Sequence, residues 1–285
     1  SLKVNGKRGG MPHCTLAGVR VTIGYLTSNT VFDTKTLQFV LNCAKSLTSR
    51  TTSTTILLKE IGMTGRLHVQ NLPLTRLLPS LGLQDPLIES PNLAPRRPIS
   101  AIRLEQGQYR LSSVFWGLTP PWLEVLDHAP HCARSETLES RAMFRDAFGA
   151  RRCVIPVSGF YVWKTQPRSK QPFLVTQVSR APLLLGALWC RYHTTLTAFT
   201  DSTALITVPA NILLSPLTDR LPVVIPNHAL STWLNPDTDT ETLNSLLAPA
   251  PLELLGAFPV SKYVNNPAYQ SSACAHPTGS MLRWA

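Results

Sequence analysis

Short apolar runs separated by turn-forming residues dominate the hydrophobic pattern of this chain. The run at 153–157 lies between two arginines and a Ser-Gly pair, and it is long enough for a buried strand but too short for a helix. Residues 159–163 predict the next strand. Because side chains alternate along a strand, Tyr161 and Trp163 are expected on the face opposite Val162.

The same pattern continues on both sides of this stretch. Strand pairs are expected at 99–104 with 109–115 and at 173–178 with 183–192, and single strands at 64–69, 205–208 and 223–225. Short helices are expected at 71–83, at 133–148 with Ser135 as N-cap, after 209–211, and at 230–234 and 240–247. Residues 91–95 read as a turn. Many short strands with few helices predict an α+β fold around a curved, barrel-like, mostly antiparallel sheet.

Residues 1–62 differ from the rest. They are rich in Ser and Thr and show no sustained period beyond 37–47, which predicts a poorly ordered extension ahead of one domain at 63–285. They also hold eight Lys and Arg against two Asp and Glu, whereas the remaining 223 residues hold nineteen against fourteen. The body is therefore only mildly basic, which permits a nucleic-acid partner without requiring one.

Other compositional features narrow the class of protein. The six cysteines form no CxxC pair, which favours reduced thiols in a cytoplasm over a disulfide framework. No apolar run approaches the roughly 18 residues of a membrane helix. The stretch 116–164 interleaves three tryptophans with five arginines, which suits single-stranded nucleic acid. The alternative is a tryptophan core surrounded by solvated arginines.

Five separated motifs resemble those of the SRAP family, the SOS-response-associated, abasic-site-processing proteins. In chain order they are WGLTPPW, CARSET, RRCVIPVSGFYVW, LTDRLPVVI and PVSKYVNNP. The likeness extends from Met63 to about Pro267. It implies a single SRAP-like domain, a role in the DNA damage response, and DNA with abasic sites as the partner.

The resemblance also implies a particular reaction. In the family the initiator Met is removed, the α-amine of the exposed Cys condenses with the aldehyde of an abasic sugar, and the thiol closes a thiazolidine ring. The amine attacks in its unprotonated form. A Glu, a His and two Asn side chains position the sugar and move protons.

This sequence departs from the family at most positions that the reaction uses. The family's Cys, Asn, Glu and His are replaced by Thr64, Cys132, Val162 and Thr218, whereas Asn92 and Glu136 remain. Valine carries no proton, and a threonine hydroxyl does not titrate near neutral pH. The substitutions therefore predict a catalytically degenerate member.

Two alternatives keep an activity. Cys132 lies beside the expected site and is a candidate replacement nucleophile, although as a buried small hydrophobe it needs no role. If Met63 is the true start, processing exposes Thr64 with a free amine, whose ring product is a less stable oxazolidine. Codons for Lys59 and Glu60 can spell a ribosome-binding sequence, which favours that start. A genuine N-terminal arm is the other reading.

The resemblance further implies a DNA-binding surface. Its candidate residues are Arg66, Trp122, Arg134, Arg141, Arg145 and Arg220. Arginine suits phosphate because its planar fork donates two hydrogen bonds at once. For Arg220 the alternative is an ion pair with Asp219 or another carboxylate, and Trp116 reads as core.

His128, His131 and Cys132 lack a fourth metal ligand, so neither a metal nor a cofactor is expected.

Together these features predict a SRAP-like protein that binds single-stranded or junction DNA without the crosslinking and self-processing reactions. The alternatives are an active processor with a non-standard nucleophile and an interaction module that does not bind DNA. We expect a cytoplasmic bacterial monomer, associated with the nucleoid when bound to DNA and with no membrane contact.

Overall fold

The computed structural model describes residues 65–70, 81, 83, 87–123, 129–195 and 197–284, together with the backbone of an N-terminal hairpin. The chain divides into two compact units, Ser1–Leu57 and Leu58–Ala285. In the first unit, β1 (His13–Leu16) pairs antiparallel with β2 (Val19–Thr22). Met63 and the rest of the predicted extension apart from this hairpin lie outside the described residues, so the predicted boundary stays a prediction.

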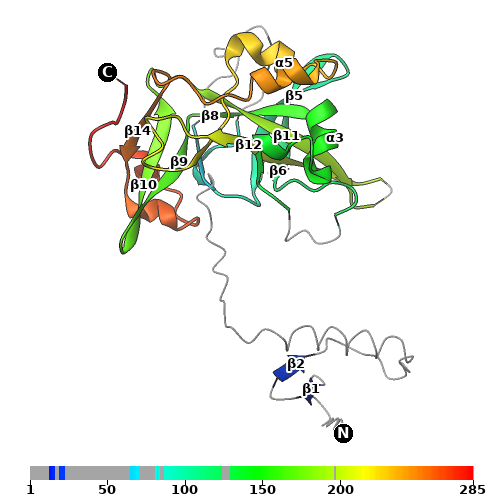
Figure 1. Ribbon diagram of the computed structural model, residues 1–285, viewed down its shortest axis with the longest axis horizontal. Coiled ribbons are helices and arrows are strands. Elements are labelled where there is room, and N and C mark those ends of the chain that lie inside the picture. Colours follow the sequence, from blue (N-terminus) through cyan, green and yellow to red (C-terminus); the bar gives the residue numbers. More distant parts are fainter. Residues whose placement is uncertain are drawn as a thin grey trace. The chain divides into compact units, whose positions relative to one another are not determined.

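Five strands of the second unit close into a barrel. In spatial order they are β11 (Leu183–His193), β8 (Arg152–Val157), β5 (Pro98–Glu105), β6 (Gln108–Trp116) and β12 (Phe199–Pro209), with β11 and β12 completing the ring (Figure 1). The short strands β7 (Cys132–Arg134) and β13 (Arg220–Pro222) add to β12. Within the described residues, the pairing is parallel only where β12 meets β6 and β7. The predicted α+β, barrel-like, mostly antiparallel architecture is confirmed.

A second, five-stranded sheet lies between two cores. Its order is β14 (Leu255–Pro259), β10 (Ser169–Gln177), β9 (Gly159–Gln166), β3 (Leu67–Val69) and β4 (Ser90–Leu93). Val162 belongs to the main core, whereas Tyr161 and Trp163 pack into a small core with Leu174 and Phe258. The predicted alternation along β9 is therefore confirmed.

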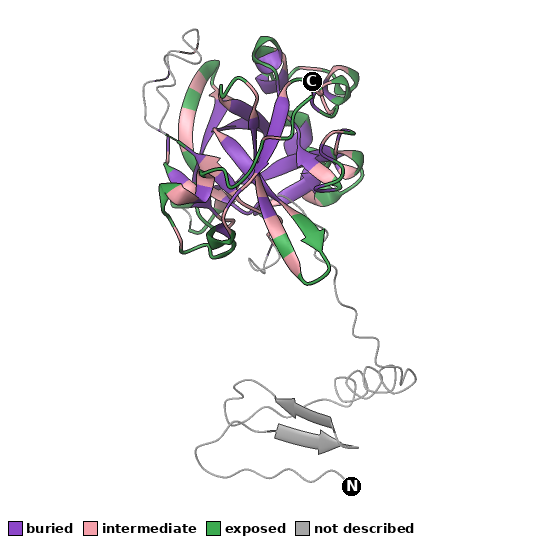
Figure 2. Ribbon diagram, turned by 90° about the vertical axis from the view of Figure 1, so that its left-hand side faces the viewer, coloured by how far each residue is buried: buried purple, intermediate pink, exposed green. Residues whose placement is uncertain are grey.

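The hairpin between β5 and β6 follows its local signal closely. Gln106 and Gly107 both have positive φ, 50° and 73°, as a two-residue turn of this kind requires. All six residues of β8 are buried, as its bracketed apolar run predicts. Figure 2 shows this buried interior and the exposed rim of loops around it.

In the part of the chain that the structure describes, helices are few and short. They are α3 (Ala142–Ala150), α4 (Leu230–Leu234) and α5 (Thr240–Ser245), with 3-10 turns η3 (Ser135–Thr137), η4 (Asn227–Ala229), η5 (Lys262–Asn265) and η6 (Ser272–Ala275). The two predicted near the C-terminal third, α4 and α5, are confirmed. The helix predicted at 133–148 is wrong in its first half, because residues 132–134 pair with β12 as a strand. Ser135 lies inside η3, and α3 begins only after Arg141, whose backbone is extended.

Three further expectations need correction. Residues 91–95 do not form only a turn, because Pro91 lies within β4, an edge strand where its missing N–H costs no ladder bond. The segments at 173–178 and 183–192 are strands, but they lie in different sheets, since β10 pairs with β9 and β14 while β11 pairs with β8 and β12. Residues 212–217 form turns and no helix. The helix predicted at 71–83 falls largely outside the described residues.

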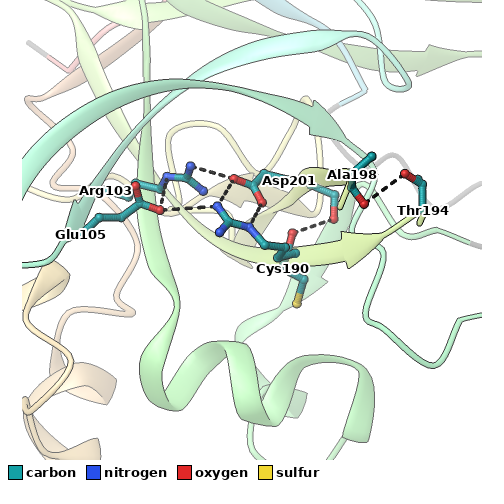
Figure 3. A network of polar contacts seen from close by, with 8 residues as sticks. Arg103, Glu105, Cys190, Thr194, Ala198 and Asp201 are labelled. Atoms are coloured by element: carbon teal, nitrogen blue, oxygen red, sulfur yellow. Dashed lines mark hydrogen bonds and ion pairs between the residues drawn. The ribbon is translucent and has the colours of Figure 1, made fainter. Parts of the chain in front are cut away.

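A buried ionic network fastens the barrel where it closes. The carboxylate of Asp201 on β12 accepts hydrogen bonds from Arg191 of β11, at 2.8 and 2.9 Å, and lies 2.7 Å from Arg103 of β5 (Figure 3). Burial alone would raise the pKa of Asp201, but the two guanidinium groups outweigh it and hold that pKa below its ordinary value.

Among the described residues, no helix is long and apolar enough to span a membrane.

Candidate functional site

Arg220 is the centre of the first group of site residues. Its guanidinium donates to both carboxylate oxygens of Glu136, at 2.9 and 2.8 Å, and to the hydroxyl and carbonyl of Thr207, at 3.1 and 2.5 Å. The alternative reading of Arg220 as an ion-pair partner is thus the one that the geometry shows, with Glu136 in place of Asp219. The hydrogen bonds from Arg220 hold the pKa of Glu136 below its usual range.

Thr207 joins this group although sequence reasoning did not single it out. Its hydroxyl donates to the carbonyl of Ala133 at 3.2 Å and accepts from Arg220, so it links β7 to β13 across β12. A threonine in a buried strand carries no signal of such a role. Its contacts depend on the parallel pairing of β12 with β7, in which Thr207 lies opposite Arg134.

Cys132 and Thr218 lie near Arg220, but neither is a good nucleophile at neutral pH. Cys132 is buried on β7, and burial raises the pKa of its thiol to about 12, an effect that the nearby Arg220 only partly offsets. At neutral pH the group is a thiol, and the thiolate is the nucleophilic form. The hydroxyl of Thr218 donates to the carbonyl of Arg220 at 3.2 Å and so completes a turn.

Val162 occupies the position where the family resemblance places an acid. Only 2% of Val162 is exposed, and the side chain belongs to the main apolar core. Trp116 is likewise fully buried, and its indole N–H donates to the carbonyl of His131 at 2.9 Å. The core reading of Trp116 is therefore confirmed.

Asn92 acts as a clamp. Its side-chain amide is fully buried and donates to the carbonyls of Val264, Asn266 and Tyr269 at 3.1, 2.9 and 3.1 Å. The carbonyl of Asn92 in turn accepts from Gln270 at 3.0 Å. Through these bonds β4 holds the segment around η5 against the five-stranded sheet.

The strand β3 carries two polar residues on the face opposite the main core. Arg66, just before β3, has a partly buried guanidinium whose pKa is lowered by that burial, and it donates to the carbonyl of Gly65 at 2.9 Å. His68 was not among the residues that the sequence singled out. Burial lowers the pKa of His68, its Nδ1 lies 3.4 Å from the carbonyl of Pro91, and its ring meets Tyr161 edge-on at 6.4 Å. The alternation around Leu67 was the signal that could have found it.

The remaining candidates are exposed. Trp122 is 56% exposed in the turn after Pro121. Arg134, Arg141 and Arg145 are exposed along the segment from β7 to α3, where Arg141 stacks over Phe144 at 5.7 Å and Arg145 pairs loosely with Asp146 at 3.6 Å. Their charges therefore face solvent.

Two candidate positions lie outside the described residues, namely Thr64 and His128. Among the residues that are described, no three His, Cys, Asp or Glu side chains gather as a metal site would require. The structure thus brings Cys132, Glu136, Thr218 and Arg220 together. Asn92 and Val162 lie on β4 and β9 of the five-stranded sheet, and Arg66 directly precedes β3, the strand between them.

Comparison with known proteins identifies the family. The model for the SOS response associated peptidase (SRAP) family matches residues 63–267. This chain belongs to the SRAP family. Abasic site processing protein YoqW of Bacillus subtilis is 33% identical over 184 residues, covering 63% of this chain and 82% of that protein. Abasic site processing protein YedK of Escherichia coli is 25% identical over 194 residues, covering 65% and 83%.

Solved structures support the same fold. A protein from Bacteroides thetaiotaomicron superposes with a TM-score of 0.63 at 18% identity, covering 73% of this chain and 97% of its own. A protein from Bordetella bronchiseptica gives 0.60 at 23% identity, covering 69% and 99%. At these identities the likeness concerns the fold alone. The α+β barrel described above is thus the SRAP architecture.

Proposed function

We propose that this SRAP protein binds single-stranded or junction DNA in the DNA damage response and does not form the covalent abasic-site crosslink. One observation carries the proposal. Three of the four substituted positions lie in the described residues and offer no titratable group near neutral pH, while Trp122, Arg134, Arg141 and Arg145 face solvent. Val162 is core, Thr218 caps a turn, and Cys132 holds its proton up to a pKa of about 12.

The exposed candidates have the chemistry that a single strand needs. Trp122 offers a flat ring for stacking on a base, which is worth about 1–3 kcal/mol. Arg134, Arg141 and Arg145 offer guanidinium groups for phosphate. Arg220 already donates to Glu136 and Thr207, so we assign it to holding β7 and η3 in place beneath these residues.

The names of the relatives indicate which DNA lesion to examine. YoqW and YedK are named abasic site processing proteins, and this makes DNA with abasic sites the first substrate to examine. We further propose that the protein acts in the bacterial cytoplasm as a monomer, needs no cofactor, and associates with the nucleoid through DNA.

The crosslink is tested with single-stranded DNA that carries one abasic site, followed by denaturing electrophoresis. We expect no adduct that survives boiling in detergent, both for the full chain and for a chain starting at Thr64. A shifted band would contradict the proposal. Cys132→Ser and Thr64→Ala would then show which residue carries the bond.

Binding is tested by titrating a labelled single strand at several salt concentrations. Arg134→Ala should weaken binding and reduce the salt slope by about 0.7, the value for one phosphate on a single strand. Trp122→Ala should weaken binding and leave the slope unchanged, because stacking releases no counterion. Arg110→Ala, an exposed cation on the β5–β6 hairpin, is the matched control. Parent-like binding by both variants would favour the interaction-module alternative.

A further inference from the structure

Two long segments of this chain contain no carboxylate side chain. Residues 147–200 and 254–285 include no Asp or Glu, although they include Lys164, Arg168, Lys170, Lys262 and Arg283. The two segments pair with one another, because β10 from the first lies beside β14 from the second. Glu89 and Glu253 precede β4 and β14, the edge strands of the same sheet. One part of the fold is thus basic and nearly free of acidic groups.

Lys170 shares a face of the β9–β10 hairpin with aromatic rings. Leu174 lies opposite Tyr161 and both belong to the small core, which identifies that face of the β9–β10 hairpin. Two residues further on, Trp163 lies opposite Pro172, and Lys170 follows on the same face because side chains alternate along a strand.

The turn η5 covers the same face and adds to it. The indole N–H of Trp163 donates to the side chain of Asn265 at 2.7 Å, and Val264 enters the small core. Lys262 and Tyr263 of η5 are exposed, and the ring of Tyr263 lies 5.0 Å from that of Tyr269. We call the surface formed by Trp163, Lys170, Lys262, Tyr263 and Tyr269 the basic-aromatic face.

This surface is exposed and rigid. Tyr263 is 64% exposed, and Lys170 and Lys262 form no ion pair with any described residue. The backbone that carries Tyr263 and Tyr269 is fixed by Asn92, which donates to the carbonyls of residues 264, 266 and 269. A ring on a fixed backbone loses little conformational entropy when a ligand binds.

We propose that the basic-aromatic face is a second binding surface for single-stranded nucleic acid, which takes phosphates on Lys170 and Lys262 and stacks a base on Tyr263. Unpaired cations beside exposed rings match a ligand that carries both negative charge and flat bases. The inference rests on the proposed function, because it assigns a second contact to the same class of ligand. It differs in place, since none of its residues belongs to the Trp122 and Arg134 surface.

An anionic membrane surface is the competing partner. It would reward insertion of apolar side chains. The exposed residues between Tyr263 and Tyr269 are instead Asn265, Asn266, Pro267 and Ala268, which include no large apolar side chain to insert. A nucleic acid therefore fits this surface better.

The test uses the full chain and a fluorescent single strand of about 20 nucleotides, longer than one typical binding site. The double variant Lys170→Ala/Lys262→Ala should weaken binding and lower the salt slope by about 1.4, the value for two phosphates. Tyr263→Ala should weaken binding about 5- to 150-fold at unchanged slope, whereas Tyr263→Phe, which keeps the ring, should bind as the parent does. Arg110→Ala is again the matched control, and thermal unfolding checks that each variant is folded.

The outcomes separate this inference from the proposed function. If Trp122→Ala and Arg134→Ala weaken binding while the basic-aromatic variants do not, this inference is wrong and the proposed function stands. If only the basic-aromatic variants weaken binding, this inference stands and the Trp122 surface is refuted. If Lys170→Ala/Lys262→Ala instead reduces binding to vesicles containing phosphatidylserine and leaves oligonucleotide binding unchanged, the surface serves a membrane and the inference is overturned.

Discussion

The surroundings of Arg220 and the surroundings of Asn92 have opposite characters. Around Arg220, the positions that serve chemistry in the family now serve packing or ion pairing, as Cys132 and Thr218 illustrate. Around Asn92, a residue that the family resemblance marks as part of the reaction holds three backbone carbonyls in the interior. The family residue that persists here is thus one that the fold itself requires.

This difference bears on whether a residue shared with the family indicates catalysis. A buried amide whose N–H groups serve three carbonyls is costly to lose whatever chemistry takes place nearby, because those carbonyls lose a hydrogen-bond donor. An acid or histidine that serves only proton transfer carries no such cost. Retention of Asn92 is therefore weak support for catalysis, whereas replacement of the acid by Val162 is strong support against it.

The largest effect is expected from restoring the acid. Val162→Glu places a carboxyl in the main core and should lower the free energy of unfolding by about 4 kcal/mol at neutral pH. Because burial raises the pKa of such a carboxyl, the loss should shrink at acid pH, where the group is neutral. Urea unfolding measures this, with Thr165→Glu on the exposed end of the same strand as control. A tolerated Val162→Glu would mean that a polar site persists there.

The next largest loss of stability is expected from removing the side chain of Asn92. Asn92→Ala leaves three carbonyls without their donor and should cost about 3 kcal/mol in the free energy of unfolding. Asn244→Ala, at an exposed position on α5, should stay within about 0.5 kcal/mol of the parent. Equal effects of the two substitutions would remove the contrast drawn above.

A smaller loss is expected at Arg220. Arg220→Met keeps the aliphatic stem but removes the donors to Thr207 and Glu136, which should cost about 2 kcal/mol. Thermal unfolding would register the change, and Arg110→Met at an exposed site should have little effect. A parent-like Arg220→Met would show that the ion pair is dispensable and that Arg220 is available to a ligand.

The smallest effect concerns pH. Arg220 lowers the pKa of Glu136 in the folded chain, so the pair stabilises the fold above the unfolded pKa of about 4.3, and this is lost as pH falls through the lower folded value. The carboxylate is 49% exposed, so Glu136→Gln should cost less than about 1 kcal/mol at pH 7. The parent and Glu136→Gln should converge in stability in acid. A gap that widens instead would assign the pKa shift to another partner.

Local pattern predicted which segments become strands but not all of their partners. The alternation at 159–163 and the buried run at 153–157 depend on periodicity and burial, which neighbouring residues encode. The pairing of β10 with β14 depends on residues about 80 positions apart, and no local signal carries it. The same limit explains why residues 132–134 looked helical, since only β12 makes them a strand.

For the candidate site, the sequence predicted which chemical groups a position offers better than it predicted which contacts they make. A valine at the position where the family resemblance places an acid predicted lost proton transfer, and Val162 is buried in the main core. The partner of Arg220 was open to several carboxylates, because ion pairs form in three dimensions. His68 and Thr207 were missed since each acts through a partner that is distant in sequence.

The closing of the barrel at β12 has a consequence for synthesis of the chain. The free edge of β6 pairs with β12 where Phe115 meets Ser202, so about 90 residues must be made before that edge is covered. At about 5–20 residues per second, the edge stays open for roughly 5–20 seconds on the ribosome. Gln108, Arg110, Ser112 and Ser113 place polar groups along β6, and these discourage pairing with another chain during that interval.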